Sequence, residues 1–92
     1  MTETLVRMVE VVNERGLHAR ASAKFVKTAA AFDAEVRVCR EGTSVDAQSI
    51  MGLMMLAAGP GSTLEISAAG PDAETALDAL CRLVEERFDE ER

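Results

Sequence analysis

The sequence contains few of the residues on which metal-binding, redox and disulfide-bonded proteins depend. It has two cysteines, one histidine, three phenylalanines and no tryptophan or tyrosine among 92 residues. Cys39 and Cys81 do not have the spacing of a zinc motif, and two cysteines are too few for a disulfide-rich secreted scaffold. One histidine without a neighbouring cysteine cannot build a metal site of the usual kind. We therefore expect free thiols, no bound metal and no cofactor.

Long apolar runs, a targeting segment and an excess of basic residues are also missing from the sequence. No run approaches the roughly 20 apolar residues that span a bilayer. The first residues, Met-Thr-Glu-Thr, lack the basic and apolar regions of a signal peptide. The formal net charge is -6, whereas nucleic-acid binding needs a basic face. These features predict a soluble cytoplasmic protein with no membrane insertion and no nucleic-acid partner.

The apolar residues that are present suffice for one domain, and we expect a single domain over residues 1–92. Hydrophobic residues make up 48% of the chain, so a core can be buried. Alternating apolar and polar residues predict strands at 5–12, 35–40, 43–46 and 63–69. Glu41-Gly42 is a hairpin turn signal between the second and third of these strands.

Apolar residues spaced three and four apart predict the helices. One helix is expected over 19–32, a short helix over 50–56, and a last helix that has Pro71 in its first turn and an apolar stripe ending at Phe88. The element order is then β-α-β-β-α-β-α. This order predicts an α+β fold, with a four-stranded antiparallel sheet whose two main helices and one short helix pack on one face.

The only histidine, His18, stands where a predicted loop becomes a predicted helix. The first turn of a helix has backbone N–H groups without intrahelical partners, and the helix dipole adds positive charge there. An anion is stabilised at such a position. A histidine at the cap could therefore accept a phosphoryl group on a ring nitrogen and present it to these donors.

Basic residues cluster around this histidine in an otherwise acidic chain. Arg15, Arg20, Lys24 and Lys27 are four of the ten lysines and arginines, and the last three share one helical face. The guanidinium group suits phosphate because its N–H groups form a planar fork. The alternative is a solvated helix face beside an incidental histidine. A nucleophile pair of His18 with Ser22 or Cys39 has no support from their spacing.

A second segment of interest runs from Asp46 to Met55. Ser49 is well placed to cap the short helix, and capping alone would explain this residue. A phosphate added to Ser49 would put a dianion on the surface at a helix N-terminus. The methionines that follow are adaptable side chains that often line partner-binding surfaces. Even so, we expect at least half of these methionine side chains to fill the core.

Together the two segments resemble the motifs of the HPr family, the histidine phosphocarriers of the bacterial phosphoenolpyruvate-dependent phosphotransferase system. Gly16-Leu17-His18-Ala19-Arg20 is similar to the phosphorylation motif of that family. Ser49-Ile50-Met51-Gly52-Leu53-Met54 is similar to its regulatory-serine motif. The spacing of the two motifs, the chain length and the element order agree as well, so the resemblance covers nearly the whole chain.

The resemblance implies an open-faced β-sandwich and a carrier that is not itself an enzyme. His18 would receive a phosphoryl group from phospho-Enzyme I, as a pros-phosphohistidine, and donate it to an EIIA domain in sugar transport. Arg20 would hold the phosphoryl oxygens, and Ser49 would be modified by an HPr kinase/phosphorylase where one exists. The partner-docking surface would include Lys27, Ile50, Met51 and Met54. We expect a monomer.

One residue departs from the family pattern, and two other functions remain open. Many family members have proline after the motif arginine, whereas this chain has Ala21, which favours a helix without restraining its first turn. The change leaves open a branch that serves regulation or nitrogen metabolism in place of sugar uptake. The first alternative function is a regulatory module that signals through Ser49 phosphorylation. The second is a small hydrolase resembling acylphosphatase.

Overall fold

The computed structural model describes residues 3–92 and has the element order that the sequence predicts. The strands are β1 (Thr4–Glu10), β2 (Glu35–Arg40), β3 (Thr43–Asp46) and β4 (Thr63–Ala69). The α-helices are α1 (Ala19–Ala30), α2 (Ile50–Met55) and α3 (Ala73–Glu85), and a 3₁₀ turn, η1 (Arg87–Asp89), follows α3. The order β-α-β-β-α-β-α is confirmed, with η1 as an addition near the C-terminus.

The strands form one antiparallel sheet in the order β1-β4-β2-β3. β4 pairs with both β1 and β2, and Val38 of β2 lies opposite Ile66 of β4. Both of these side chains are buried, as their alternation with polar residues predicts. Glu41 and Gly42 have φ angles of 49° and 85°, the geometry of a two-residue hairpin turn. The predicted hairpin between β2 and β3 is therefore confirmed.

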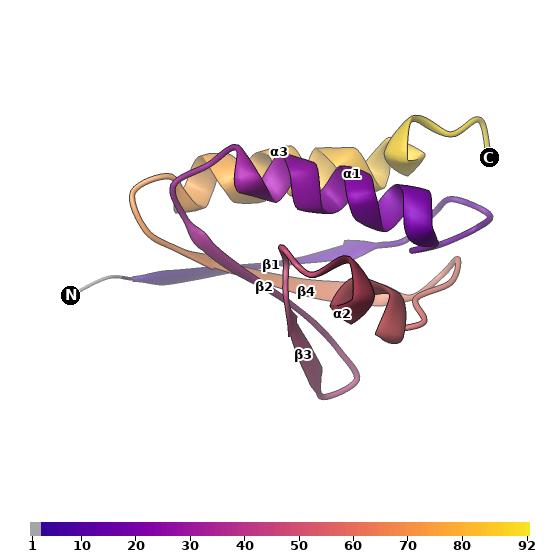
Figure 1. Ribbon diagram of the computed structural model, residues 1–92, viewed down its shortest axis with the longest axis horizontal. Coiled ribbons are helices and arrows are strands. Elements are labelled where there is room, and N and C mark those ends of the chain that lie inside the picture. Colours follow the sequence, from indigo (N-terminus) through magenta and orange to yellow (C-terminus); the bar gives the residue numbers. More distant parts are fainter. Residues whose placement is uncertain (1–2) are drawn as a thin grey trace.

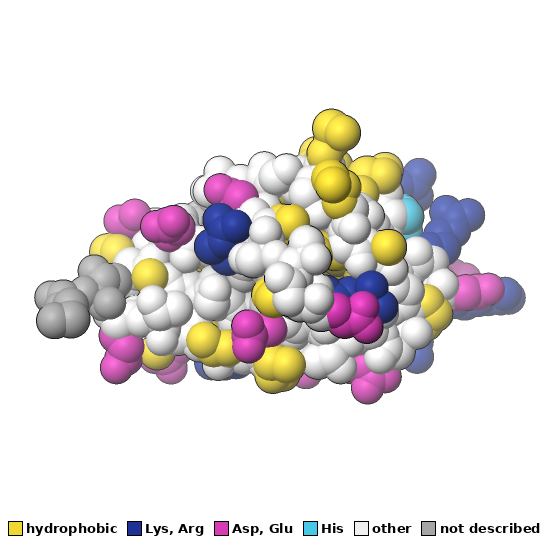
Figure 2. Space-filling view, turned by 90° about the horizontal axis from the view of Figure 1, so that it is seen from below, with side chains coloured by type: hydrophobic (Ala, Val, Ile, Leu, Met, Phe, Trp, Pro, Cys, Tyr) yellow, Lys and Arg dark blue, Asp and Glu magenta, His cyan; other side chains and the backbone are white. Residues whose placement is uncertain are grey.

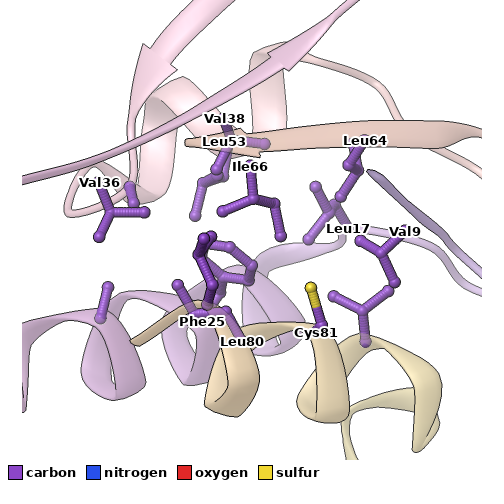
Figure 3. Close-up of a cluster of buried hydrophobic side chains, with 14 of the residues drawn as sticks. Val9, Leu17, Phe25, Val36, Val38, Leu53, Leu64, Ile66, Leu80 and Cys81 are labelled. Carbon is purple, nitrogen blue, oxygen red and sulfur yellow. The ribbon is translucent and has the colours of Figure 1, made fainter. Parts of the chain in front are cut away.

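Two long helices cover one face of this sheet and leave the other face open. α1 and α3 lie side by side over the sheet (Figure 1). Phe25 of α1, Leu80 of α3 and Ile66 of β4 point toward one another in the core (Figure 3). α2 contacts α1 and β3 and adds Leu53 to the same core. Burial of each such side chain contributes about 1.5–3 kcal/mol to folding.

Several predicted boundaries differ from the structure by a few residues. α1 ends at Ala30 because the N–H groups of Ala31 and Phe32 donate to carbonyl oxygens three residues back, as in a 3₁₀ turn, so Phe32 lies beyond the helix. Asp72 is the N-cap of α3, which leaves Pro71 outside the helix and not in its first turn. The strand predicted at 5–12 is shorter, and so is the helix predicted at 50–56. None of the helices within residues 3–92 combines the length and apolar character needed to cross a membrane.

The last turn of the chain was predicted wrongly. The sequence places Phe88 on the stripe of the last helix, but α3 ends at Glu85. Arg87, Phe88 and Asp89 have φ angles of 61°, 54° and 64°. Left-handed backbone costs about 1–2 kcal/mol per residue for L-amino acids. The turn nevertheless puts Phe88 at 0% exposure in the core, and its burial offsets part of that cost.

The loop between β1 and α1 is held against the loop between α2 and β4. The N–H of Leu17 donates to the carbonyl oxygen of Ala58 over 2.9 Å. Gly16 has a φ of 64°, and a Cβ atom at this residue would lie 2.2 Å from the Ala58 oxygen and 2.8 Å from the Gly59 Cα. Only glycine fits this backbone contact. The contact fixes the chain immediately before α1.

We predict that Gly16→Ala destabilises the protein more than the matched variant Gly61→Ala. Both glycines have positive φ angles, but a Cβ atom at Gly61 would meet nothing within 4 Å. In the control, Gly61→Ala, the free energy of unfolding should fall by about 1 kcal/mol because of the backbone conformation alone. In Gly16→Ala the free energy of unfolding should fall by more than this amount, because the new Cβ atom would also push the backbone of Ala58 and Gly59 away. Urea denaturation gives both free energies of unfolding, and equal losses would show that the close contact contributes nothing.

Candidate functional site

His18 is the N-cap residue of α1, as the sequence predicts. Its backbone is extended, with φ of -75° and ψ of 179°, and its carbonyl oxygen accepts the first helical hydrogen bond from Ser22 at 2.9 Å. The imidazole makes no capping hydrogen bond, and the first turn contains no acidic residue. The N–H groups at this end of α1 are therefore open to an anion. The imidazole itself is 23% exposed.

The predicted basic cluster divides into residues with different surroundings. Arg15, Arg20 and Lys24 line a surface hollow whose other wall is formed by residues 89–92. Arg20 is exposed and has no hydrogen bond or ion pair within residues 3–92. Lys24 instead donates to the carbonyl oxygen of Phe88 over 2.7 Å. Lys27 is exposed and does not line the hollow. Arg15 and Arg20 are therefore the basic residues of the hollow that could bind an anion.

A carboxylate that no local pattern in the sequence indicates lies against the histidine. Glu90 Oε2 is hydrogen-bonded to His18 Nε2, and Glu90 Oε1 accepts from Asn13 Nδ2 over 2.9 Å. The Glu90 side chain is 19% exposed. Burial would raise the pKa of the Glu90 carboxyl, but its hydrogen bonds and the charges of His18 and Arg15 outweigh burial and bring this pKa below its ordinary value. Glu90 is therefore ionised at neutral pH.

Three contacts hold the tail that carries Glu90. Phe88 is fully buried, and its carbonyl oxygen accepts the hydrogen bond from Lys24. The carbonyl oxygen of Arg92 accepts from the N–H of Glu14 over 3.0 Å. The only signal of this in the sequence is an apolar residue, Phe88, among the charges of the last residues. A pattern of helical spacing cannot show where such a tail returns.

Asn13 links this tail to the loop before the histidine. It is 0% exposed, and its Nδ2 donates both to Glu90 and, over 3.0 Å, to the carbonyl oxygen of Gly16. Its Oδ1 is buried without a hydrogen-bond partner in the described part of the chain. The structure makes it the support for both Glu90 and the Gly16 loop.

The second predicted segment forms α2, and Ser49 is its N-cap. Ser49 Oγ accepts from the N–H of Gly52 over 2.9 Å, so the capping prediction is confirmed. The expectation that at least half of the methionine side chains fill the core is wrong, because all three methionines of α2 are exposed and only Leu53 of this helix is buried. The others are exposed: Ile50 40%, Met51 74%, Met54 44% and Met55 77%. Two turns of helix cannot place all of these residues on the buried face.

The exposed apolar side chains of α2 lie near the histidine. α2 packs against α1, whose first residues follow His18. Figure 2 shows protruding hydrophobic side chains on one side of the single histidine and basic side chains on the other. We call Ile50, Met51, Met54 and Met55 the α2 patch. The structure thus joins an apolar patch, a histidine and a basic hollow on one end of the molecule.

The described residues contain no candidate metal centre. No group of three or more histidine, cysteine, aspartate or glutamate side chains within residues 3–92 is arranged to hold a metal ion. Burial raises the pKa of the Cys81 thiol above its ordinary value, so this cysteine stays protonated.

The chain matches known proteins over nearly its whole length. The model of the family described as "PTS HPr component phosphorylation site" matches residues 5–86. The chain is 51% identical to the phosphocarrier protein HPr of Cupriavidus necator, over 94% of this chain and 97% of that protein. It is 44% identical to the phosphocarrier protein NPr of Shewanella violacea, over 94% of each chain.

The fold agrees with these matches. The crystal structure of HPr-C-His from Thermoanaerobacter tengcongensis superposes with a TM-score of 0.91 at 41% identity, and covers 96% of this chain and 99% of that one. The open antiparallel sheet and its element order are those of HPr structures. The chain belongs to the HPr family of phosphocarrier proteins of the phosphotransferase system.

Proposed function

We propose that His18 accepts a phosphoryl group from phospho-Enzyme I and donates it to an EIIA domain. The observation that carries this proposal is the position of His18 at the open N-terminus of α1, two residues before Arg20, whose guanidinium lines the hollow and has no ion pair within residues 3–92. Both features stabilise a dianion where it would be attached to the ring. The protein is then a substrate of its partners and not an enzyme, and it acts as a monomer in the bacterial cytoplasm.

The transfer needs a neutral ring nitrogen as nucleophile. The lone pair of Nδ1, the pros nitrogen, attacks phosphorus, and the bond between phosphorus and the donor breaks with its electron pair returning to the donor. The phosphoryl oxygens are held by the N–H groups of α1 and by Arg20. Because the site lies at the surface, the group remains accessible to the next acceptor. The same steps run in reverse toward EIIA.

The α2 patch and Lys27 would supply the docking surface for these partners. Exposed methionines adapt to partners of different shape, and Lys27 adds positive charge on α1. A basic and apolar surface on an acidic protein favours short-lived complexes with acidic partners. The choice between sugar transport and a nitrogen-related branch depends on which EIIA binds this surface.

Ser49 would be a regulatory phosphorylation site for an HPr kinase/phosphorylase. It is half-buried at the N-terminus of α2, next to Ile50 and Met51 of the α2 patch. A phosphate there keeps the helix capped but adds charge beside an apolar docking surface, which opposes partner binding. In the alternative function, the regulatory module, partner binding would depend on Ser49 and His18 would take no phosphate.

We predict that the protein gains one phosphate when mixed with phosphoenolpyruvate and Enzyme I, and that His18→Ala does not. Intact mass measured before and after brief acid treatment checks this, because phosphohistidine is acid-labile and phosphoserine is not. An acid-stable gain that persists in His18→Ala would contradict transfer on the histidine and favour the Ser49-centred alternative.

We predict that Arg20→Ala slows phosphoryl transfer from Enzyme I by about 10- to 100-fold, because one donor to the developing charge is lost. Arg82→Ala removes the same charge from an exposed position of α3, outside the hollow, and should leave the rate unchanged. Rapid-quench measurement of phosphorylated protein gives both rates. Equal rates for the two variants would remove Arg20 from its proposed role.

We predict that Ser49→Asp weakens docking with Enzyme I and that Ser49→Asn does not. Both replacements are good N-caps, so α2 is retained in each variant, but only aspartate adds a charge beside the α2 patch. The expected result is a higher KM for Ser49→Asp, with the Asn variant close to the wild type. A similar KM for both variants would show that charge at this position has no regulatory effect.

A further inference from the structure

The contact between Glu90 and His18 has a consequence for the ring that goes beyond the proposed function. We propose that Glu90 is a positioning residue for phosphoryl transfer: it holds the proton on Nε2 of His18 and leaves Nδ1 as the nucleophile. This inference rests on the proposed role of His18 as the phosphoryl acceptor. It assigns a role to the C-terminal tail, residues 87–92, which neither motif of the chain contains.

The chemistry of the two partners fixes the direction of the hydrogen bond. An ionised carboxylate has only acceptor atoms, so the proton between Glu90 Oε2 and His18 Nε2 belongs to the imidazole. In a neutral imidazole a proton on one nitrogen leaves a lone pair on the other. Nδ1 has no hydrogen-bond partner within residues 3–92, so its lone pair is available. Glu90 thus selects the tautomer that the transfer needs.

The same carboxylate stabilises the charge that develops during transfer. When Nδ1 attacks phosphorus, a bond forms between nitrogen and phosphorus, and the bond from phosphorus to the donor breaks in favour of the donor. The ring keeps its Nε2 proton and gains positive charge. A carboxylate on that N–H favours the charged ring, as the aspartate of a Ser-His-Asp triad does for its histidine. The ring returns to neutrality when the group moves to the acceptor.

The surroundings of Glu90 are built to hold it in this place. Asn13 is fully buried and donates to Glu90 Oε1, so the carboxylate is fixed through both of its oxygens. Phe88 anchors the tail in the core, and Lys24 binds the Phe88 carbonyl oxygen. A backbone that runs through three left-handed residues is retained only where its surroundings enforce it. These contacts hold the Glu90 carboxylate against Nε2 of His18.

The charges around the tail do not provide another carboxylate for this task. Arg15, Arg20 and Lys24 face the hollow from the loop and α1. The other carboxylates that line it are Glu14 from the loop and Asp89 and Glu91 from the tail, and none of them is hydrogen-bonded to His18 within residues 3–92. Asp89 lies 3.8 Å from the ammonium group of Lys24, and Glu91 is exposed. Glu85, the exposed last residue of α3, does not line the hollow, which makes it a matched control for Glu90 in residue type.

The first test uses the unphosphorylated protein and needs no partner. Long-range ¹H–¹⁵N NMR spectra of the His18 ring, recorded where the ring is neutral, report which nitrogen carries the proton. We expect one tautomer, with the proton on Nε2, in the wild type and in Glu85→Ala. Glu90→Ala should show a mixture of tautomers and faster exchange of the Nε2 proton with water. A spectrum of Glu90→Ala that matches the wild type would overturn the proposal.

The second test measures phosphorylation by Enzyme I. Glu90→Ala should slow the transfer by about 10-fold or more, the usual effect of losing a residue that orients a functional histidine. Glu90→Gln keeps an acceptor oxygen for Nε2 but not the charge, so its rate should lie between those of the wild type and Glu90→Ala. Glu85→Ala should behave as the wild type.

Two results in this second test would overturn the role of Glu90. An unchanged rate in Glu90→Ala would show that the carboxylate does not assist the ring. A faster rate would show that the tail obstructs the site. If the wild type itself takes no phosphate from a competent Enzyme I, the proposed function fails, while the NMR result still reports on the contact. The two failures are therefore distinguishable.

Discussion

The close backbone contact between Gly16 and the loop at 58–59 determines where α1 begins, and the functional site depends on it. Because no side chain fits between Gly16 and the Ala58 carbonyl group, the two loops meet directly. The N–H of Leu17 is then hydrogen-bonded to the carbonyl oxygen of Ala58, and His18 becomes the N-cap residue of α1. The imidazole consequently lies at the one end of the helix that attracts anions. A shift of one residue in this loop would turn the ring away from those N–H groups.

The electrostatics of this end of the molecule oppose those of the chain as a whole. The net charge is -6, yet Arg15, Arg20 and Lys24 gather at the start of α1. Lys24 donates a hydrogen bond to the carbonyl oxygen of Phe88 in the tail, whereas Arg20 has no ion pair within residues 3–92. A site that accepts and releases a phosphoryl group needs such a balance, because a fully basic pocket would hold the group too firmly to pass it on. The Glu90 carboxylate contributes to the same balance.

Local patterns in the sequence predicted most of the fold and half of the site. Alternation in β2 and β4 and the hairpin at Glu41-Gly42 were sufficient for the sheet, since these signals act between neighbours in the chain. The N-cap positions of His18 and Ser49 were predicted for the same reason. The return of Phe88 to the core was not, because its left-handed turn is stabilised only by distant residues. The pairing of Glu90 with His18 joins residues 72 positions apart and leaves no local signal.

The central claim is that Nδ1 of His18 is the atom that carries the phosphoryl group, with Nε2 protonated against Glu90. The most direct test is NMR of the ¹⁵N-histidine-labelled protein after phosphorylation, where coupling between phosphorus and one ring nitrogen identifies the bonded atom. The account predicts coupling to Nδ1 and a proton on Nε2. Coupling to Nε2 would contradict it, because that nitrogen could not bind phosphorus and donate to Glu90 at once.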